Sequence, residues 1–378
     1  MEKNIYFDHA ATSWPKPSAV SHSVKRAMRE NGGNPGRSGH ILSVNASKAI
    51  YKCREAVSEL FAFDDPERVI FTQNTTYALN TAIKGLVKHG DHVIISNLEH
   101  NSVVRPLEKI AEEKGISYGT FDATDYEDED VLYCFRRALK PNTKTVVVTA
   151  ASNVCGKILP ISKISAECHR RGITVIVDGA QAGGVFPINF KTFGADILCL
   201  AGHKGLYGPQ GTGIMLCSEK ITPESLAEGG NGINSEDRTM GDILPEKLEA
   251  GTPNTPGICG LYEGIRYVAD ESVEEIFGTT LLLTRFATEA LLQSNNITVY
   301  GDYGVKAPVI SFNINGVDSS YVSSVLSDNG ICTRSGLHCA PLAHTSLGTN
   351  GGTVRISFGH KNTRSEIEKF LKIISKIR

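Results

Sequence analysis

The chain has 378 residues, enough for two domains or for one large domain with an appendage. Its 39 Lys and Arg residues nearly balance 41 Asp and Glu residues, which argues against a basic surface for nucleic acid. No apolar run approaches the roughly 18 residues that span a bilayer, and the start lacks the apolar core of a signal peptide. We therefore expect a cytoplasmic protein with neither a nucleic-acid nor a membrane partner. The nine cysteines form no C-x-x-C pair, so we expect most to be buried, reduced thiols.

Short apolar runs alternate with amphipathic stretches between about residues 68 and 217. The runs are continuous and rich in Val and Ile, which is typical of strands buried on both faces of a parallel sheet. They lie at 69–71, 92–95, 145–148, 174–177, 197–200 and 213–216. The stretch from Tyr77 to Val87 carries its apolar residues on one helical face. This alternation predicts an α/β domain around a mostly parallel sheet.

The pattern changes after a Gly- and Pro-rich segment at 249–257. A long helical region follows, then strand-like runs at 309–312 and 354–357. The last helix opens with a capping box formed by Thr363 and Glu366. We predict a large α/β domain at 15–257 and a smaller α+β domain at 258–378, joined by an N-terminal segment at 1–14.

A candidate phosphate site follows the first buried strand, where small polar residues lead into a helix that includes Thr75 and Thr76. Helix N-termini offer free N–H groups and the positive end of the dipole to an anion. Either threonine could instead simply cap the helix. This segment alone leaves both interpretations open.

Two further motifs follow buried strands. Asp178 stands at the end of one strand, and Lys204 lies in a glycine-rich turn after the next. Glycines at 202, 205, 208, 211 and 213 indicate backbone brought close to a bound group. Pyridoxal phosphate requires a lysine amine, a carboxylate for its ring nitrogen and a phosphate site. The three motifs together predict this cofactor.

Across nearly its whole length the sequence resembles the class V aminotransferase family of fold type I pyridoxal-phosphate enzymes, in the branch of cysteine desulfurases and selenocysteine lyases. The resemblance implies a fold type I transferase with a smaller C-terminal domain. Ordered motifs carry it, at residues 6–12, 74–76, 99–100, 152–156, 178–181, 202–204, 249–254 and 334–339.

The resemblance implies roles around the cofactor. Lys204 matches the lysine that binds it covalently, Asp178 the acid at the ring nitrogen, and His100 the histidine stacked on the ring with a part in proton transfer. The other matching positions contact the phenolic oxygen, the substrate or the phosphate, and they are Thr75, Thr76, Asn153, Gln181, His203 and Thr252. Thr252 matches a residue that reaches the phosphate of the partner subunit, which implies a homodimer.

The resemblance also implies a substrate and a nucleophile. Arg355 matches the clamp for the carboxylate of L-cysteine, with Arg334 and Asn153 as further substrate contacts. Cys339 matches the thiolate that attacks the substrate's sulfur and becomes a persulfide as alanine leaves. The short stretch from Cys339 to Arg355 resembles members with a compact loop, which often depend on a sulfur-acceptor protein.

Two alternatives stay open at this point. A selenocysteine lyase, or a β-lyase for another amino acid, would use the same cofactor site. A non-catalytic persulfide or zinc-binding scaffold would use His338, Cys339 and His344. A scaffold would have no need for Lys204, Asp178 and a phosphate site together, so we favour the desulfurase.

Overall fold

A seven-stranded sheet forms the centre of the computed structural model, which describes residues 4–36, 38–124, 127–230, 232, 236–301 and 304–377. The strand order is β2-β8-β7-β6-β5-β3-β4, and all neighbours are parallel except those of β8. The strands are β2 (Val69–Thr72), β3 (His92–Ser96), β4 (Ser117–Phe121), β5 (Thr143–Thr149), β6 (Thr174–Asp178), β7 (Ile197–Ala201) and β8 (Gly213–Cys217). All six runs predicted as strands are strands, so the prediction of a mostly parallel sheet is confirmed.

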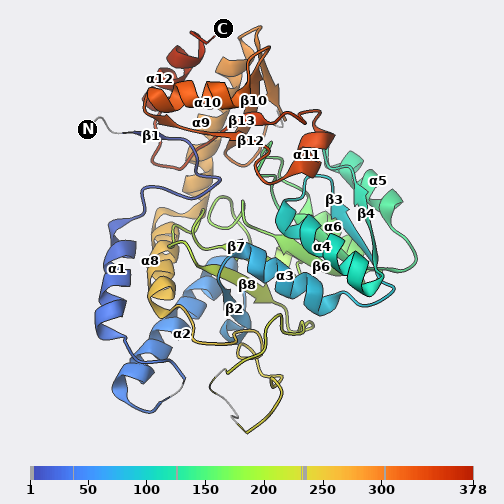
Figure 1. Ribbon diagram of the computed structural model, residues 1–378, viewed down its shortest axis with the longest axis vertical. Coiled ribbons are helices and arrows are strands. Elements are labelled where there is room, and N and C mark those ends of the chain that lie inside the picture. Colours follow the sequence, from blue (N-terminus) through green and yellow to red (C-terminus); the bar gives the residue numbers. More distant parts are fainter. Residues whose placement is uncertain are drawn as a thin grey trace.

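Helices cover both faces of this sheet (Figure 1). One face packs against α2 (Ile41–Phe61), α5 (Asp128–Ala138), α6 (Ile161–His169) and α8 (Thr255–Glu271). The other packs against α3 (Thr75–Leu86) and α4 (Asn101–Lys114). Successive strand residues alternate between the two cores: Val146 and Val148 face the first, and Val147 faces the second. Burial on both faces explains the continuous apolar runs in the sequence.

A second, four-stranded sheet of order β12-β13-β10-β9 lies toward the C-terminus (Figure 1). Its strands are β9 (Ile297–Tyr300), β10 (Val309–Ile314), β12 (Arg334–Gly336) and β13 (Thr353–Ser357), with α9 (Val273–Leu292), α10 (Ser319–Asp328) and α12 (Arg364–Ile374) packed beside them. Thr363 and Glu366 form the predicted capping box of α12. The short helix α11 (Pro341–Ser346) lies between β12 and β13 in the chain, and α7 (Phe190–Phe193) lies between β6 and β7 of the large sheet.

The N-terminal segment joins the two sheets. Strand β1 (Ile5–Tyr6) pairs in parallel with β11 (Ile331–Cys332), and α1 (Ser18–Glu30) packs on α8. Ile258, Leu261 and Ile265 of α8 belong to the core of the large sheet, so this helix accompanies that sheet. The division between residues 257 and 258 stays a prediction. Residues 1–3 lie outside the described part of the chain.

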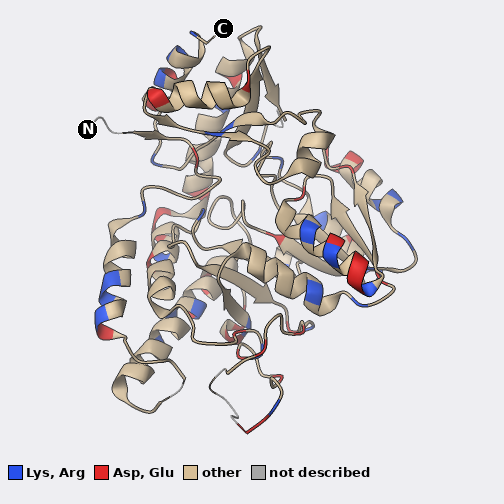
Figure 2. Ribbon diagram, in the orientation of Figure 1, with Lys and Arg blue, Asp and Glu red and all other residues tan. Residues whose placement is uncertain are grey.

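Charge is spread over the outer helices: α4 carries Lys and Arg interspersed with Glu, whereas α1 carries Lys and Arg with a single Glu at its end (Figure 2). The strands of the large sheet carry apolar residues on both faces. Among the described residues, no helix is both long and apolar enough to cross a membrane.

Candidate active site

Parallel strands place the predicted polar residues at one edge of the large sheet. Asp178 ends β6 and is the register partner of Thr149, which ends β5. His100 follows β3, and Lys204 follows β7. Because the carboxyl ends of parallel strands meet at one edge, side chains far apart in the sequence converge there.

Asp178 is a buried carboxylate at this edge, with 3% of its surface exposed. Burial raises its pKa, while the Ala180 N–H at 2.9 Å, the charge of Lys204 and the Ser102 hydroxyl lower it again. The carboxyl group therefore has donors and a cation to support its anionic form. The Asp178 carboxylate can form an ion pair with a positively charged group that is brought into the site.

Lys204 supplies the amine. Burial lowers its pKa to about 8; Asp178 opposes this shift, and Arg355 and Arg334 add to it. About a tenth of the amine is therefore neutral at pH 7, which is the form that acts as a nucleophile or base. Lys204 also lines a small cavity of about 40 Å³ with Gln181, whose side-chain amide donates to the Ala10 carbonyl at 2.9 Å.

His100 is the N-cap of α4. Its Nδ1 accepts from the Ser102 N–H at 3.0 Å and lies 2.8 Å from the Ser102 hydroxyl. Burial, followed by the charges of Lys204 and the nearby arginines, lowers its pKa to about 4. The ring is therefore neutral near pH 7. Because Ser102 contacts both His100 and Asp178, it couples the two predicted residues.

Arg355 is almost completely buried, with 1% of its side chain exposed. It donates from Nη1 to the Asn153 carbonyl at 3.1 Å and from Nη2 to Asp8 at 2.9 Å. The side-chain amide of Asn153 donates to the His338 carbonyl at 2.8 Å. Asn153 thus links Arg355 to the loop that carries Cys339.

Cys339 is exposed at the start of the segment before α11, and Arg334 Nη2 lies 3.5 Å from its sulfur. His338 and Cys339 both adopt left-handed backbone angles, with φ of 49° and 58°. The Asn101 N–H donates to the Cys339 carbonyl at 2.9 Å, which ties the loop to the first turn of α4. The sulfur therefore has a cationic neighbour and a fixed backbone.

The zinc-binding alternative finds no support in this geometry. Nowhere in the described ranges do three or more His, Cys, Asp or Glu side chains group so as to hold a metal ion. His338 Nε2 pairs with Thr353 at 3.0 Å, and His344 Nδ1 pairs with Thr349 at 2.8 Å. Burial lowers the pKa of His338 to about 2, so this ring adds no positive charge beside Cys339.

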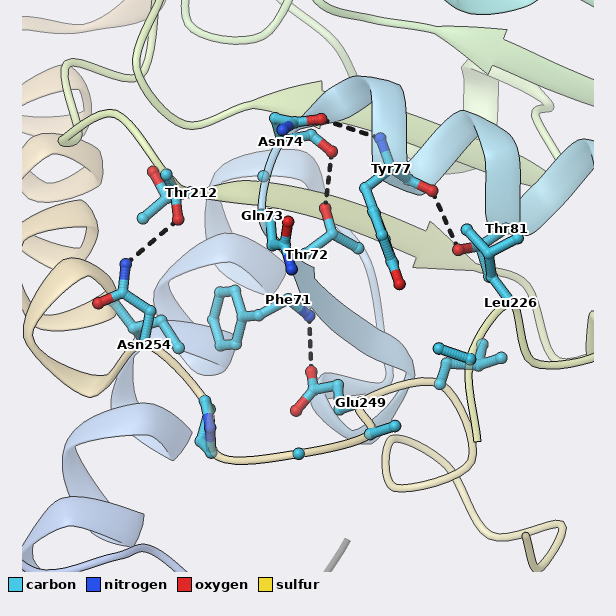
Figure 3. Close-up of a pocket in the computed structure, with 18 of the residues that line it drawn as sticks. Phe71, Thr72, Gln73, Asn74, Tyr77, Thr81, Thr212, Leu226, Glu249 and Asn254 are labelled. Carbon is cyan, nitrogen blue, oxygen red and sulfur yellow. Dashed lines mark hydrogen bonds between the residues drawn. The ribbon is translucent and has the colours of Figure 1, made fainter. Parts of the chain in front are cut away.

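The predicted phosphate segment opens a larger cavity of about 700 Å³ (Figure 3). The N-cap of α3 is Asn74, whose side chain accepts from the Tyr77 N–H at 2.9 Å, so neither Thr75 nor Thr76 is the cap. Within the described chain, the N–H groups of these two threonines at the start of α3 have no hydrogen-bond acceptor. His203 and Thr252 line the same cavity as Asn74. An anion bound at the start of α3 would meet these free N–H groups.

The glycine-rich turn after β7 has a different cause from the one expected. A Cβ atom on Gly202 would lie 2.2 Å from the Thr212 hydroxyl, and one on Gly205 would lie 2.3 Å from the Gly183 carbonyl. A Cβ on Gly213 would meet the backbone of Asn74 at 2.5 Å. Close packing of the protein backbone on itself therefore accounts for these glycines without a bound group.

Comparison with known proteins adds to this geometry. A model of the family described as aminotransferase class-V matches residues 5–370. The chain belongs to this family.

Named members of the family resemble the chain over almost all of it. It is 33% identical to a probable cysteine desulfurase of Mycolicibacterium paratuberculosis, over 99% of this chain but only 55% of that protein. It is 32% identical to a probable cysteine desulfurase of Methanothermobacter thermautotrophicus, over 97% of this chain and 93% of that one.

Solved structures give the same family relationship. A cysteine desulfurase from Thermococcus onnurineus NA1 superposes with a TM-score of 0.92 at 32% identity, covering 99% of this chain and 94% of that one. The Escherichia coli cysteine desulfurase CsdA gives 0.87 at 26% identity, with the same two coverages. The prediction of a class V aminotransferase fold is confirmed.

Two site residues were missed from the sequence. Asp8 lies in the N-terminal motif of the family resemblance but received no role, and it contacts Arg355. Ser102 contacts His100 and Asp178. Its position two residues after a helix-capping histidine was a local signal, whereas nothing local connects Asp8 with Arg355.

Proposed function

We propose that this protein is a pyridoxal-phosphate-dependent cysteine desulfurase, which converts L-cysteine to L-alanine and retains the sulfur as a persulfide on Cys339. The observation that carries the proposal is the position of Cys339. Its sulfur lies 3.5 Å from Arg334 Nη2, and the same guanidinium acts on the amine of Lys204. The named relatives support the same activity.

The residues present fit pyridoxal phosphate. Lys204 would hold its aldehyde carbon, Asp178 its ring nitrogen, and the N–H groups at the start of α3, with His203, its phosphate. Ala201 precedes the Gly-His-Lys motif where family members usually carry a hydroxyl, so one phosphate contact is missing. When bound, the cofactor supplies an electron sink for the electron pair released when the Cα–H bond breaks.

Side chains of this protein transfer the protons and accept the sulfur. The neutral amine of Lys204 accepts the Cα proton, since its lowered pKa leaves it partly unprotonated. The thiolate of Cys339, whose sulfur lies 3.5 Å from Arg334 Nη2, attacks the substrate's sulfur. A sulfur–sulfur bond forms as the carbon–sulfur bond breaks, and the electron pair of the carbon–sulfur bond stays on Cβ. Cβ then takes a proton, and Lys204 returns a proton to Cα, which completes alanine. His100, neutral near pH 7, can carry a proton within the site.

Arg355 would bind the substrate, with Arg334 and Asn153 as further contacts. The buried guanidinium of Arg355 faces the loop of Cys339 through Asn153. A guanidinium offers paired N–H donors that match a carboxylate, so it would orient the amino acid with its sulfur toward Cys339.

The proposal extends to partners and location. We place the protein in the cytoplasm as a homodimer that passes sulfur to an acceptor protein. The thiol of Cys339 is exposed, so an acceptor thiolate can reach its persulfide. L-Selenocysteine is a second candidate substrate, because selenium leaves carbon more readily than sulfur does.

The test is to load the protein with pyridoxal phosphate, add L-cysteine or L-selenocysteine, and quantify alanine. We expect alanine from L-cysteine and a visible absorbance that borohydride abolishes. Lys204→Ala should lose both, because we place no other amine at the cofactor's aldehyde. A colourless wild-type protein that carries zinc would instead support the scaffold.

A further inference from the structure

The small cavity that Lys204 lines is polar and lies apart from the nucleophile. Its walls include Lys204, His9, Tyr207 and His360, and Cys339 is not among the described residues that line it. Its volume is about 40 Å³, and a polar cavity needs roughly 10–15 Å³ to hold one water molecule. The cavity can therefore hold water beside Lys204, away from the exposed thiol of Cys339.

Tyr207 connects this cavity to a chain of hydrogen bonds. Its hydroxyl lies 3.2 Å from His360 Nδ1, and the Tyr267 hydroxyl lies 2.8 Å from His360 Nε2. Tyr267 is in turn hydrogen-bonded to Glu271, the last residue of α8. His360 keeps 6% of its side chain exposed, whereas Glu271 keeps 35%. The four side chains thus lead from the cavity to solvent.

The hydrogen bonds of this chain all point outward. Lys361, 2.8 Å from Glu271, lowers the pKa of that carboxyl group, which as an anion only accepts. Tyr267 therefore donates to Glu271, and its oxygen accepts from the N–H at His360 Nε2. Burial lowers the pKa of His360, so the ring is neutral and Nδ1 accepts from the Tyr207 hydroxyl. The Tyr207 oxygen keeps a lone pair for a water molecule in the cavity.

The backbone ties this chain to the lysine. The Tyr207 N–H donates to the Lys204 carbonyl at 2.9 Å, and Tyr207 adopts a left-handed φ of 53°, which is unusual for an aromatic residue. A Cβ on Gly359 would lie 2.4 Å from the His9 ring, so glycine lets that ring pack against the turn before His360. Burial lowers the pKa of His9 to about 3, so its neutral ring gives the cavity a polar wall without a charge.

We propose that the cavity and the chain from Tyr207 to Glu271 form a proton path between the amine of Lys204 and solvent. The proposal rests on the proposed function and deepens it, because it concerns the proton that Lys204 takes from Cα. That proton passes to cavity water and then outward, each group accepting one proton as it releases another. A proton from solvent returns through the same groups before Cα is reprotonated. One outward and one inward transfer restore every hydroxyl and the His360 ring.

The fate of the Cα hydrogen tests this path. The loaded protein converts L-cysteine that carries deuterium at Cα, in ordinary water, and mass spectrometry measures the deuterium left at Cα of alanine. Without exchange, the amine would return about one third of the label, because the ammonium carries three equivalent hydrogens. We expect the wild type to retain less than about a tenth of that amount, and Tyr207→Phe and Tyr267→Phe to retain at least about threefold more than the wild type.

The retained label separates a proton path from a purely structural role. A tyrosine that only supports the fold would change the rate of alanine formation but not the retained fraction. Wild-type retention in both variants would therefore overturn the inference. Tyr133→Phe is the matched control, because its ring is 57% exposed, and it should retain as little label as the wild type.

A measurement on the cofactor-free protein separates this inference from the proposed function. Nitrogen-15 NMR of the histidines at pH 7 shows which ring nitrogen carries the proton, and His360→Gln identifies the signals. We expect the proton of His360 on Nε2, and Tyr207→Phe should shift the Nδ1 signal of His360 but not that of His89, which pairs with the Lys114 carbonyl. A proton on Nδ1 would overturn the path. A loaded wild type that forms no alanine would count against the proposed function, and the NMR result would still decide on the chain.

Discussion

At the scale of single residues, Cys339, the proposed nucleophile, lies on strained backbone. Non-glycine residues in the left-handed region cost about 1–3 kcal/mol each, and His338 and Cys339 adopt it in succession. Hydrogen bonds from Asn153 to the His338 carbonyl and from Asn101 to the Cys339 carbonyl hold the loop in this form. The strained backbone holds the thiol of Cys339 in a fixed position beside Arg334.

Cys339→Ala separates the two candidate substrates. Sulfur leaves cysteine only as a nucleophile captures it, so alanine formation from L-cysteine should fall by about a hundredfold or more. Activity on L-selenocysteine should persist in large part, because the carbon–selenium bond is weaker. The cofactor's absorbance should stay unchanged, since Cys339 does not hold the cofactor.

Mass spectrometry of the wild type after brief exposure to L-cysteine provides the companion measurement. The added sulfur should lie on the peptide of Cys339. Cys332, half-buried in β11, serves as the internal control. Sulfur on Cys332, or normal desulfuration by Cys339→Ala, would remove the nucleophile assignment.

Glu99, adjacent to His100, is fully buried. Its Oε1 accepts from the Ser96 hydroxyl at 2.5 Å and the Thr149 N–H at 2.7 Å, while Oε2 has no partner in the described chain. Burial raises its pKa to about 8, against the lowering effect of these donors. Below that pH the side chain is neutral, which spares the neighbouring Asp178 a second negative charge.

The raised pKa of Glu99 predicts how stability depends on pH. Between the unfolded pKa near 4.5 and the folded pKa of about 8, the folded state holds the proton that the unfolded state has lost. Stability is therefore lost as pH rises through this window, by about 3–5 kcal/mol from this group. Glu99→Gln cannot ionise, so urea unfolding should show it gaining on the wild type between pH 5 and pH 9. Glu113→Gln, at an exposed site, is the control; an equal difference at both pH values would contradict the prediction.

At the scale of elements, close backbone contact between β8 and the start of α3 shapes the phosphate segment. A Cβ on Gly213 would lie within 2.7 Å of Asn74 backbone atoms and of the Thr72 hydroxyl. Asn74 caps α3, so this contact fixes where the helix begins. The position of the free N–H groups thus depends on a glycine in another strand.

Gly213→Ala should displace that helix start. We expect a loss of about 1–3 kcal/mol in unfolding free energy from the overpacking, and weaker binding of pyridoxal phosphate as Asn74 shifts. Gly241→Ala is the matched control, because a Cβ there meets nothing within 4 Å. Chemical denaturation and cofactor titration measure the two effects. Equal stability and affinity in the two variants would show that the contact is unimportant.

At the scale of the whole molecule, the N-terminal segment brings the two sheets to one site. Its β1 pairs with β11, its Asp8 contacts Arg355, and its Ser13 N–H donates to the His203 carbonyl at 3.1 Å. Lys16 donates to the same carbonyl at 2.6 Å. One short segment therefore contacts both Arg355, the proposed substrate-binding arginine, and the loop of Lys204.

We expect the active species to be a homodimer. Thr252 lies exposed on the cavity lined by Asn74 and His203, and the family resemblance places such a residue at the partner's phosphate. Sedimentation at working concentration should give twice the mass of one chain, and Thr252→Ala should weaken cofactor binding several-fold. An active monomer at that concentration would refute the assembly.

The sequence by itself determined the large sheet and the positions of Asp178 and Lys204. Continuous apolar runs specify strands buried on both faces, and the end of such a strand is where an α/β sheet binds its ligands. The capping box of α12 could also be predicted from the sequence, because Thr363 and Glu366 lie only three residues apart. The family motifs then assigned Cys339 and Arg355.

Only the tertiary structure decided which groups these residues meet. Asp8 and Arg355 lie at opposite ends of the chain, and a strand pairing brings them within 2.9 Å. The glycines near Lys204 serve contacts with Thr212, Gly183 and Asn74, which no local pattern records. Local signals report backbone geometry and burial, whereas charge pairing and close approach depend on segments that become neighbours only in the folded chain.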